Sequence, residues 1–207
     1  NHACVHALWK ETDAAIRSLR EAVDAGFGES DQHLGFLKTD SDLDSLREDA
    51  RFKALVAELS PMPKLAELAP ERLFDFYPGE WEMLDGETVE MLVSVTPAFG
   101  DRGLRVSMRN PADGAETATA LFVYESERKQ WRQTWMSDAG QTITMTGGRD
   151  GDTIALRVET DTKGSAKNGR AVFSDITRGS FTYSWQTTTD EGKTWTKAAS
   201  RTFKRRG

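Results

Sequence analysis

The chain has 207 residues, of which 38% are hydrophobic and 29% charged, a balance typical of one large or two small globular domains. Its net charge of −6 argues against nucleic acid or an anionic membrane surface as the main partner, because phosphate binding needs a concentrated basic face. The single cysteine, Cys4, allows neither a disulfide framework nor a thiolate metal site within one chain, and no apolar run approaches the ~20 residues of a membrane span.

The first 60 residues have the periodicity of helices. Small and apolar residues recur at steps of three and four from Ala3 to Val23, which predicts an antiparallel helix pair over residues 3–25 with Gly26 as its C-cap. A polar stretch follows, and a second apolar stripe then predicts a helix over residues 45–58. Because the sequence enters this helical pattern at once and shows no signal peptide, we expect a fragment or a processed form, and the compartment stays open.

Three aspartates precede the second stripe. The spacing Asp40-x-Asp42-x-Asp44 opens like a calcium loop, but Ser45 stands where the sharp turn needs glycine and Arg51 stands where the bidentate glutamate should be. We therefore expect a helix N-cap around these aspartates and no metal site.

The helical part resembles a tetratricopeptide repeat. The resemblance rests on Ala3-Cys4-Val5-His6-Ala7 together with Ala15, Leu19 and Ala22, which places small residues where two helices approach. His6 departs from the family, which usually has tyrosine there, and residues 40–59 are similar to the capping end after a last repeat. One helix pair cannot bury its apolar face alone, so the resemblance implies packing on the rest of the chain, on a second copy or on further repeats. An unrelated helical hairpin is the alternative.

From Phe74 onward the hydrophobic period changes to two. Apolar and polar residues alternate over residues 88–95, with Leu92 as the exception, and over 104–109, 153–158 and 181–186. Clusters of turn-forming residues separate these runs. The pattern predicts about 8–10 short antiparallel strands, which normally close or fold over on themselves. The predicted fold is therefore α+β by segregation. A helical segment spans residues 1–60, a linker spans 61–72, and an antiparallel β-barrel spans 73–207.

The predicted barrel resembles the lipocalin-like (calycin) barrels. The resemblance rests on Gly79-Glu80-Trp81 at the first strand and on an arginine of the last strand, for which Arg201 is the candidate. It implies that Trp81 closes one end of the barrel and that Arg201 lies across its ring, within ~6 Å. The run from Leu121 to Trp135 is also similar to uncharacterised bacterial lipocalin-like domains of unknown function.

The segment from Thr188 to Trp195 matches the Asp-box hairpin of sialidases and other β proteins. Asp190 can accept hydrogen bonds from the turn amides, Gly192 can adopt a positive φ, and Trp195 can pack under the turn. Because the chain has one copy and is too short for a propeller, the motif predicts a structural role.

Residue types that carry catalysis are scarce in the predicted barrel. All three histidines lie before residue 34, so the barrel has neither a Ser–His nucleophile system nor a histidine ligand for a metal or haem. The carboxylates Glu80, Glu82 and Asp85 near the first strand are typical of a solvent-facing strand. We therefore assign no catalytic residue, no cofactor and no metal, and the enzymatic interpretation ranks last.

An apolar barrel interior with few polar groups predicts a binding site for a small, partly apolar molecule. The candidate ligand-binding residues are Met91, Met108, Gln133, Trp135, Tyr183 and Trp185. The alternative is a filled barrel that serves as a rigid platform, while the repeat-like helices contact a protein partner. An internal cavity of roughly 300 Å³ or more favours the first hypothesis, and a contiguous exposed apolar patch on the helices favours the second.

Overall fold

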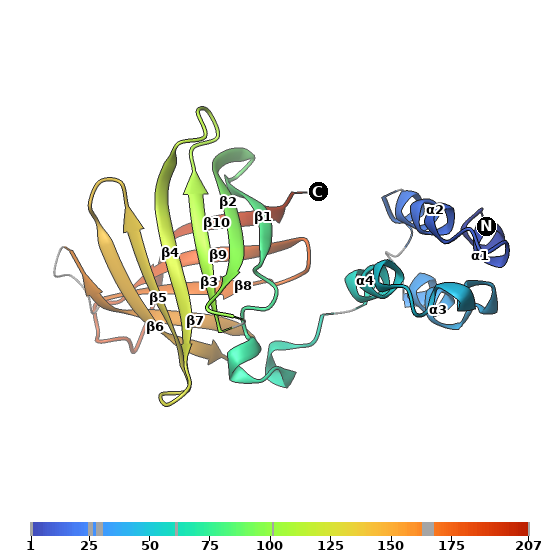
Figure 1. Cartoon of the computed structure of the whole chain (residues 1–207). Coiled ribbons are helices and arrows are strands. Elements are labelled where there is room, and N and C mark those ends of the chain that lie inside the picture. The colour runs from blue at the N-terminus through green and yellow to red at the C-terminus, as the bar shows by residue number, and fades with distance from the viewer. Residues whose placement is uncertain are drawn as a thin grey trace. The chain divides into compact units, whose positions relative to one another are not determined.

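The computed structural model describes residues 2–24, 27, 31–60, 62–100, 102–162 and 168–206. The chain forms two compact units, Asn1–Met62 and Pro63–Gly207 (Figure 1). Among the described residues, no helix combines the length and apolar character needed to cross a membrane.

The first unit is helical. It contains α1 (His2–Leu8), α2 (Thr12–Asp24), α3 (Asp31–Thr39), the 3-10 helix η1 (Ser41–Leu46) and α4 (Ala50–Leu59). Their apolar faces meet in one core, formed by Ala3, Ala7, Ala15, Leu19, Leu37, Leu43, Leu46, Phe52 and Leu55. The expected stripes are therefore buried within the unit itself.

Two features of this unit differ from the sequence expectation. The stretch between the two stripes contains α3, which buries Leu34 and Leu37. The expected helix over residues 45–58 begins only at Ala50, because η1 precedes it. Gly26, the expected C-cap, lies outside the described residues.

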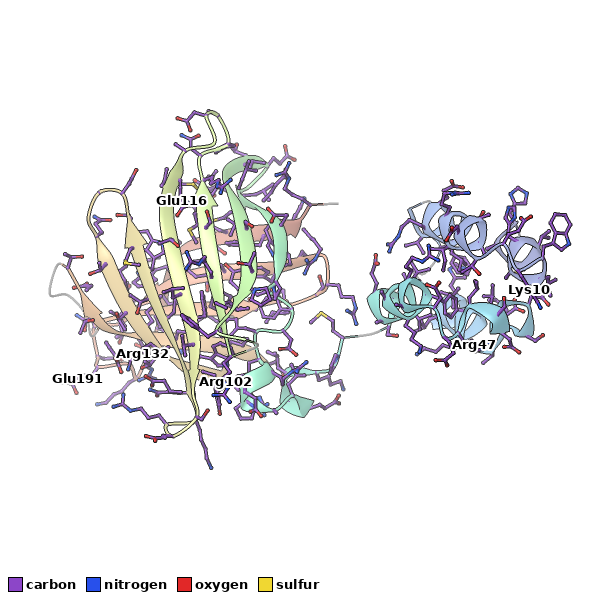
Figure 2. All side chains as sticks on the ribbon, in the orientation of Figure 1. Lys10, Arg47, Arg102, Glu116, Arg132 and Glu191 are labelled. Carbon is purple, nitrogen blue, oxygen red and sulfur yellow. The ribbon has the colours of Figure 1, made fainter. Side chains whose placement is uncertain are left out.

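The aspartates before α4 act as helix caps. Asp40 is the N-cap of η1, and its carboxylate accepts a hydrogen bond from the Asp42 amide at 3.0 Å. Asp49 caps α4 in the same way through the Arg51 amide. Arg47, labelled in Figure 2, donates to the carbonyl oxygens of Lys38 at 2.8 Å and Asp40 at 2.9 Å, which ties η1 to the end of α3.

The second unit is a closed barrel of ten antiparallel strands. The strands are β1 (Gly79–Asp85), β2 (Thr88–Ala98), β3 (Gly103–Arg109), β4 (Glu116–Glu125), β5 (Gln130–Ser137), β6 (Thr142–Asp150), β7 (Thr153–Asp161), β8 (Gly169–Ser174), β9 (Ser180–Thr187) and β10 (Thr196–Arg205). Each strand pairs with the next one in the sequence, and β1 pairs with β10 to close the circle (Figure 1). The predicted fold class, helices followed by an antiparallel barrel, is confirmed.

A short segment before β1 fills one end of the barrel. It includes the 3-10 turns η2 (Leu65–Glu67) and η3 (Pro70–Arg72) and lies across the barrel end in Figure 1. Phe74, which is 1% exposed, packs edge-on against Phe122, Trp131 and Phe173 at ring separations of 5.1–5.2 Å. The Trp131 indole donates to the Pro70 carbonyl at 2.8 Å, which fixes the segment to β5. Aromatic rings therefore occupy this end.

Candidate ligand-binding cavity

The strand registers bring one inward-facing row of side chains together from every side of the barrel. Directly paired residues share a face, so Met83 lies beside Met91, Gln133 beside Met145, and Tyr183 beside Phe173. Alternation sends the neighbouring residues outward. Arg132, next to Gln133 and labelled in Figure 2, forms 2.6 Å ion pairs with Glu125 and Glu159 on the outer face.

The interior of the barrel contains a cavity of about 260 Å³. Its wall consists of Tyr77, Met83, Met108, Phe122, Gln133, Trp135, Ile143, Met145, Phe173, Tyr183, Trp185 and Phe203. Several inward-facing members, Met108, Trp135 and Trp185 among them, are only half-buried because they border open space. The wall is apolar and adaptable, since methionine and aromatic side chains accept varied shapes.

Five of the six candidate ligand-binding residues lie in this wall: Met108, Gln133, Trp135, Tyr183 and Trp185. Met91 does not line the cavity. Its sulfur instead accepts a hydrogen bond from the Thr117 hydroxyl at 3.6 Å, at a register shift where β3 meets β4. The sequence did not single out five further wall residues. They are Tyr77, Met83, Phe122, Ile143 and Phe203, of which Met83 and Ile143 are placed in the wall by the strand register.

The polar groups of the wall are few and uncharged. Gln133 is 5% exposed, and its side-chain oxygen Oε1 has no hydrogen-bond partner among the described residues. Burial raises the pKa of Tyr183 to about 12 and raises that of Tyr77 further, with a smaller contribution from the neighbouring Tyr183. Both phenols therefore stay protonated at neutral pH and can donate or accept one hydrogen bond each.

One expected contact is wrong: the arginine over Trp81 is Arg205 and not Arg201. The guanidinium carbon of Arg205 lies 4.2 Å from the centre of the Trp81 ring. Its nitrogens donate to the carbonyl oxygens of Arg178 at 2.7 Å and of Phe76 and Pro78 at 2.9 Å each. Trp81 is fully buried and pairs directly with Arg205 across the β1–β10 ladder. A cation on an aromatic face thus joins the two strands that close the barrel.

The same arginine explains the glycine before Trp81. A Cβ atom on Gly79 would lie 2.1 Å from the Arg205 Nη1 atom, and Gly79 has a φ of +132°. Only glycine leaves the guanidinium room to reach the Pro78 carbonyl and adopts this backbone without strain. The Gly-x-Trp sequence and the terminal arginine therefore form one structural unit at this end.

Arg201 forms a different cluster. It shares the inward row of β10 with Phe203 and Arg205, two and four residues further along. Its guanidinium makes a paired contact with the Glu90 carboxylate, with Nη2 3.2 Å from Oε1, and lies 3.5 Å from Asp85. Its remaining nitrogen donates to the Ser200 carbonyl at 2.8 Å. The positive charge of Arg201 is therefore matched by two carboxylates.

The Asp-box segment is a tightly bonded turn. Asp190 accepts hydrogen bonds from the Thr194 amide and hydroxyl and from the Thr188 hydroxyl, at 2.6–2.8 Å, and these bonds lower its pKa to about 2. Trp195 lies against Arg170 and Arg157, whose guanidinium carbons are 4.4 and 5.3 Å from its ring centre. These contacts belong to the turn and to the outer surface of the barrel.

One group of possible metal ligands lies in the helical unit and was not anticipated. Cys4, Asp40 and Asp42 offer ligand atoms within 4.8 Å of one another. However, Asp40 is already the cap of η1, and burial raises the pKa of the Cys4 thiol, with a further contribution from Asp40. The Cys4 thiol donates to the Asp40 carboxylate at 3.8 Å, so we assign Asp40 the role of helix cap and acceptor for Cys4.

Comparisons with known proteins give a likeness in structure alone. No protein-family model matches the chain, and no curated protein matches it. Among solved structures, the chain is similar to Rv2717c from M. tuberculosis, with 18% sequence identity and a TM-score of 0.38 over 72% of this chain and 100% of the other. This likeness is too low to carry any argument about the site.

Proposed function

We propose that the barrel binds a small, partly apolar molecule in its internal cavity. The observation that supports this proposal is the hollow itself: about 260 Å³ bounded mainly by methionine and aromatic side chains, with only neutral polar groups among the described wall residues. The volume lies just below the roughly 300 Å³ at which sites for drug-sized ligands begin, so the ligand is small. A further support is the closure formed by Gly79, Trp81 and Arg205, which is of the kind that the lipocalin-like resemblance implies, with Arg205 in place of the expected Arg201.

A fluorescent apolar probe tests the proposal. Titrating the full chain with 1-naphthylamine, a fluorophore of two fused rings, should give a saturable change in probe emission at one site per chain. Met108→Trp places a larger side chain in the cavity wall and should weaken binding at least tenfold. Met136→Trp is the matched control, because Met136 is exposed on the outer face of β5 and its replacement should leave binding unchanged.

Two results would contradict this function. One is the absence of a saturable response in the wild-type chain. The other is equal binding by the Met108→Trp and wild-type chains, which would place the probe outside the cavity. If Met108→Trp proves unfolded by circular dichroism, Met83→Phe repeats the test from β1.

The second candidate function is protein interaction through the repeat-like helical unit. Exposed apolar side chains favour it, since Val5, Leu8, Trp9 and Phe36 are 41–69% exposed. A photo-crosslinking residue in place of Trp9, tested in cells that naturally produce the protein, should form a defined covalent adduct with one protein. The same residue in place of Thr142 on the barrel surface is the control and should form no such adduct. The absence of a specific adduct at position 9 would count against this function.

A further inference from the structure

The cavity wall contains one buried polar atom whose hydrogen-bonding capacity is unused. Gln133 is 95% buried, which follows from its 5% exposure, and its Oε1 atom has no partner among the described residues. An unpaired buried carbonyl oxygen costs free energy comparable to a lost hydrogen bond, and such groups are rare in folded proteins. The Gln133 side chain lines the cavity, but Oε1 itself is buried, so a molecule inside the cavity can become its partner once the amide turns.

The amide can turn either end toward a ligand. Its last torsion is broad and roughly two-fold, so a half-turn exchanges the carbonyl and the NH₂ group. A hydroxyl group can donate to the carbonyl or accept from the NH₂ group, and it therefore satisfies both arrangements. Tyr77 and Tyr183 line the same cavity, and a phenol hydroxyl can offer a second hydrogen bond.

The charges near the cavity disfavour an anionic ligand. Among the residues that the structure describes, none that lines the cavity is charged. Arg201, the cross-strand neighbour of Tyr183, already bonds Glu90 and lies beside Asp85, so two carboxylates oppose one guanidinium. Arg205 is occupied by three carbonyl oxygens and by Trp81 at the closed end. A carboxylate brought into this cavity would lose its hydration without gaining a free cation.

The volume restricts the size of the ligand. An apolar cavity of about 150 Å³ accommodates one benzene ring. A cavity of about 260 Å³ therefore takes a molecule of about two fused rings or an equivalent short chain.

We propose that the barrel selects a neutral molecule of about two-ring size that carries a hydroxyl group, and that Gln133 is the residue that recognises this hydroxyl. This inference rests on the proposed binding function and adds the chemical class of the ligand. It assigns Gln133 a specificity role, distinct from the apolar wall that supplies most of the contact area.

Three matched probes test the selectivity. Isothermal titration of the full chain at pH 7 compares 2-naphthol, naphthalene and 2-naphthoate, which share one ring system and differ in the polar group. We expect 2-naphthol to bind about tenfold more tightly than naphthalene, because it relieves the unpaired amide, and 2-naphthoate to bind more weakly than both.

Gln133→Met removes the amide while keeping a side chain of similar length. It should retain naphthalene binding and reduce the preference for 2-naphthol to within about twofold. Gln141→Met is the control, since Gln141 is exposed in the turn before β6, and it should keep the tenfold preference. A purely structural role for Gln133 would change the affinity for both probes together and leave their ratio unaltered.

The outcomes separate this inference from the function on which it rests. Binding of neither naphthalene nor 2-naphthol would overturn the binding function itself. Equal binding of the two by the wild-type chain, tightest binding of 2-naphthoate, or a tenfold preference retained in Gln133→Met would overturn the selectivity alone. The probe order in the wild-type chain tests the ligand class even if the Gln133→Met chain does not fold.

Discussion

Replacement of Arg205 by alanine should destabilise the barrel far more than replacement of Arg201. Arg205→Ala removes three charge-assisted hydrogen bonds to carbonyl oxygens and the cation–π contact with Trp81. Hydrogen bonds from a charged group contribute about 1.5–3 kcal/mol each when buried, and less here because Arg205 is exposed on one side. With about 0.5–1 kcal/mol for the aromatic contact, we expect a loss of about 2–4 kcal/mol in unfolding free energy.

Arg201→Ala removes an ion pair whose side chains are 27% and 33% exposed. Pairs of this kind contribute about 0.2–1 kcal/mol. The two variants remove the same type of side chain from the same inward row of one strand. The difference between their free energies of unfolding therefore measures the contacts that Arg205 makes at the closed end of the barrel.

Urea denaturation followed by tryptophan emission provides the measurement, because five of the six tryptophans lie in the barrel unit. With a slope of about 1–3 kcal/mol per molar urea, Arg205→Ala should lower the midpoint by about 1 M or more. Arg205→Lys retains the charge but not the planar fork and should recover only part of the loss. A midpoint for Arg201→Ala as low as that for Arg205→Ala would refute the assignment of Arg205 as the closing residue.

Three further predictions concern other parts of the barrel unit. Gly147→Ala should lower the free energy of unfolding by more than about 2 kcal/mol, because a Cβ atom there would lie 2.0 Å from the Ala155 carbonyl oxygen. Gly140 lies in open space at φ +73°, so Gly140→Ala should cost only the backbone strain of about 1–2 kcal/mol. The urea midpoints of the two variants test this difference. Tyr183, with its pKa raised to about 12, should remain protonated after the unfolded phenol ionises near pH 10, so wild-type stability should fall between pH 10 and 12 more steeply than that of Tyr183→Phe. Asp190, with its pKa lowered from 3.8 to about 2, should stabilise the protein above pH 4 and lose that effect toward pH 2, so that Asp190→Asn flattens the acid limb of a stability–pH curve.

The strands could be predicted from the sequence because the alternation of apolar and polar residues is a local pattern. Alternation over residues 181–186 appears in the structure as β9, with Phe181 inside and its neighbour outside. Turn chemistry is equally local: Asp190 and Gly192 form the predicted tight turn, with Gly192 at φ +88°. Closure follows from strand number and antiparallel order, which the sequence also indicated.

Helix α3 escaped the sequence analysis for a physical reason. Its apolar residues, Leu34, Phe36 and Leu37, span barely one turn, and Gly35 lowers the intrinsic helix propensity in their midst. The helix exists because Leu34 and Leu37 are buried in the unit. Such tertiary stabilisation leaves no periodic pattern in a nine-residue segment.

The prediction that Arg201 contacts Trp81 was wrong because local periodicity cannot distinguish between residues on the same face of a strand. Arg201, Phe203 and Arg205 all share one face of β10, so alternation predicts an inward direction equally for all three. Which of them reaches Trp81 depends on the register between β1 and β10, the pair of strands farthest apart in the barrel sequence. The register places Trp81 opposite Arg205, four residues, or about 13 Å of strand, beyond Arg201.

Like the register between β1 and β10, the cavity depends on the closed sheet as a whole. Methionine and aromatic residues fill a barrel or line a hollow according to how far the sheet is staggered, and stagger is a property of the closed sheet and not of any strand. Here Phe74 and its neighbours occupy the end where Trp81 and Arg205 meet, so the rings of that end pack on one another. Beyond them, the wall residues Met108, Trp135 and Trp185 meet no plug among the described residues, and they stay half-buried around open space. An apolar ligand that enters this space buries apolar surface that the protein alone leaves uncovered. Ligand binding should therefore raise the free energy of unfolding.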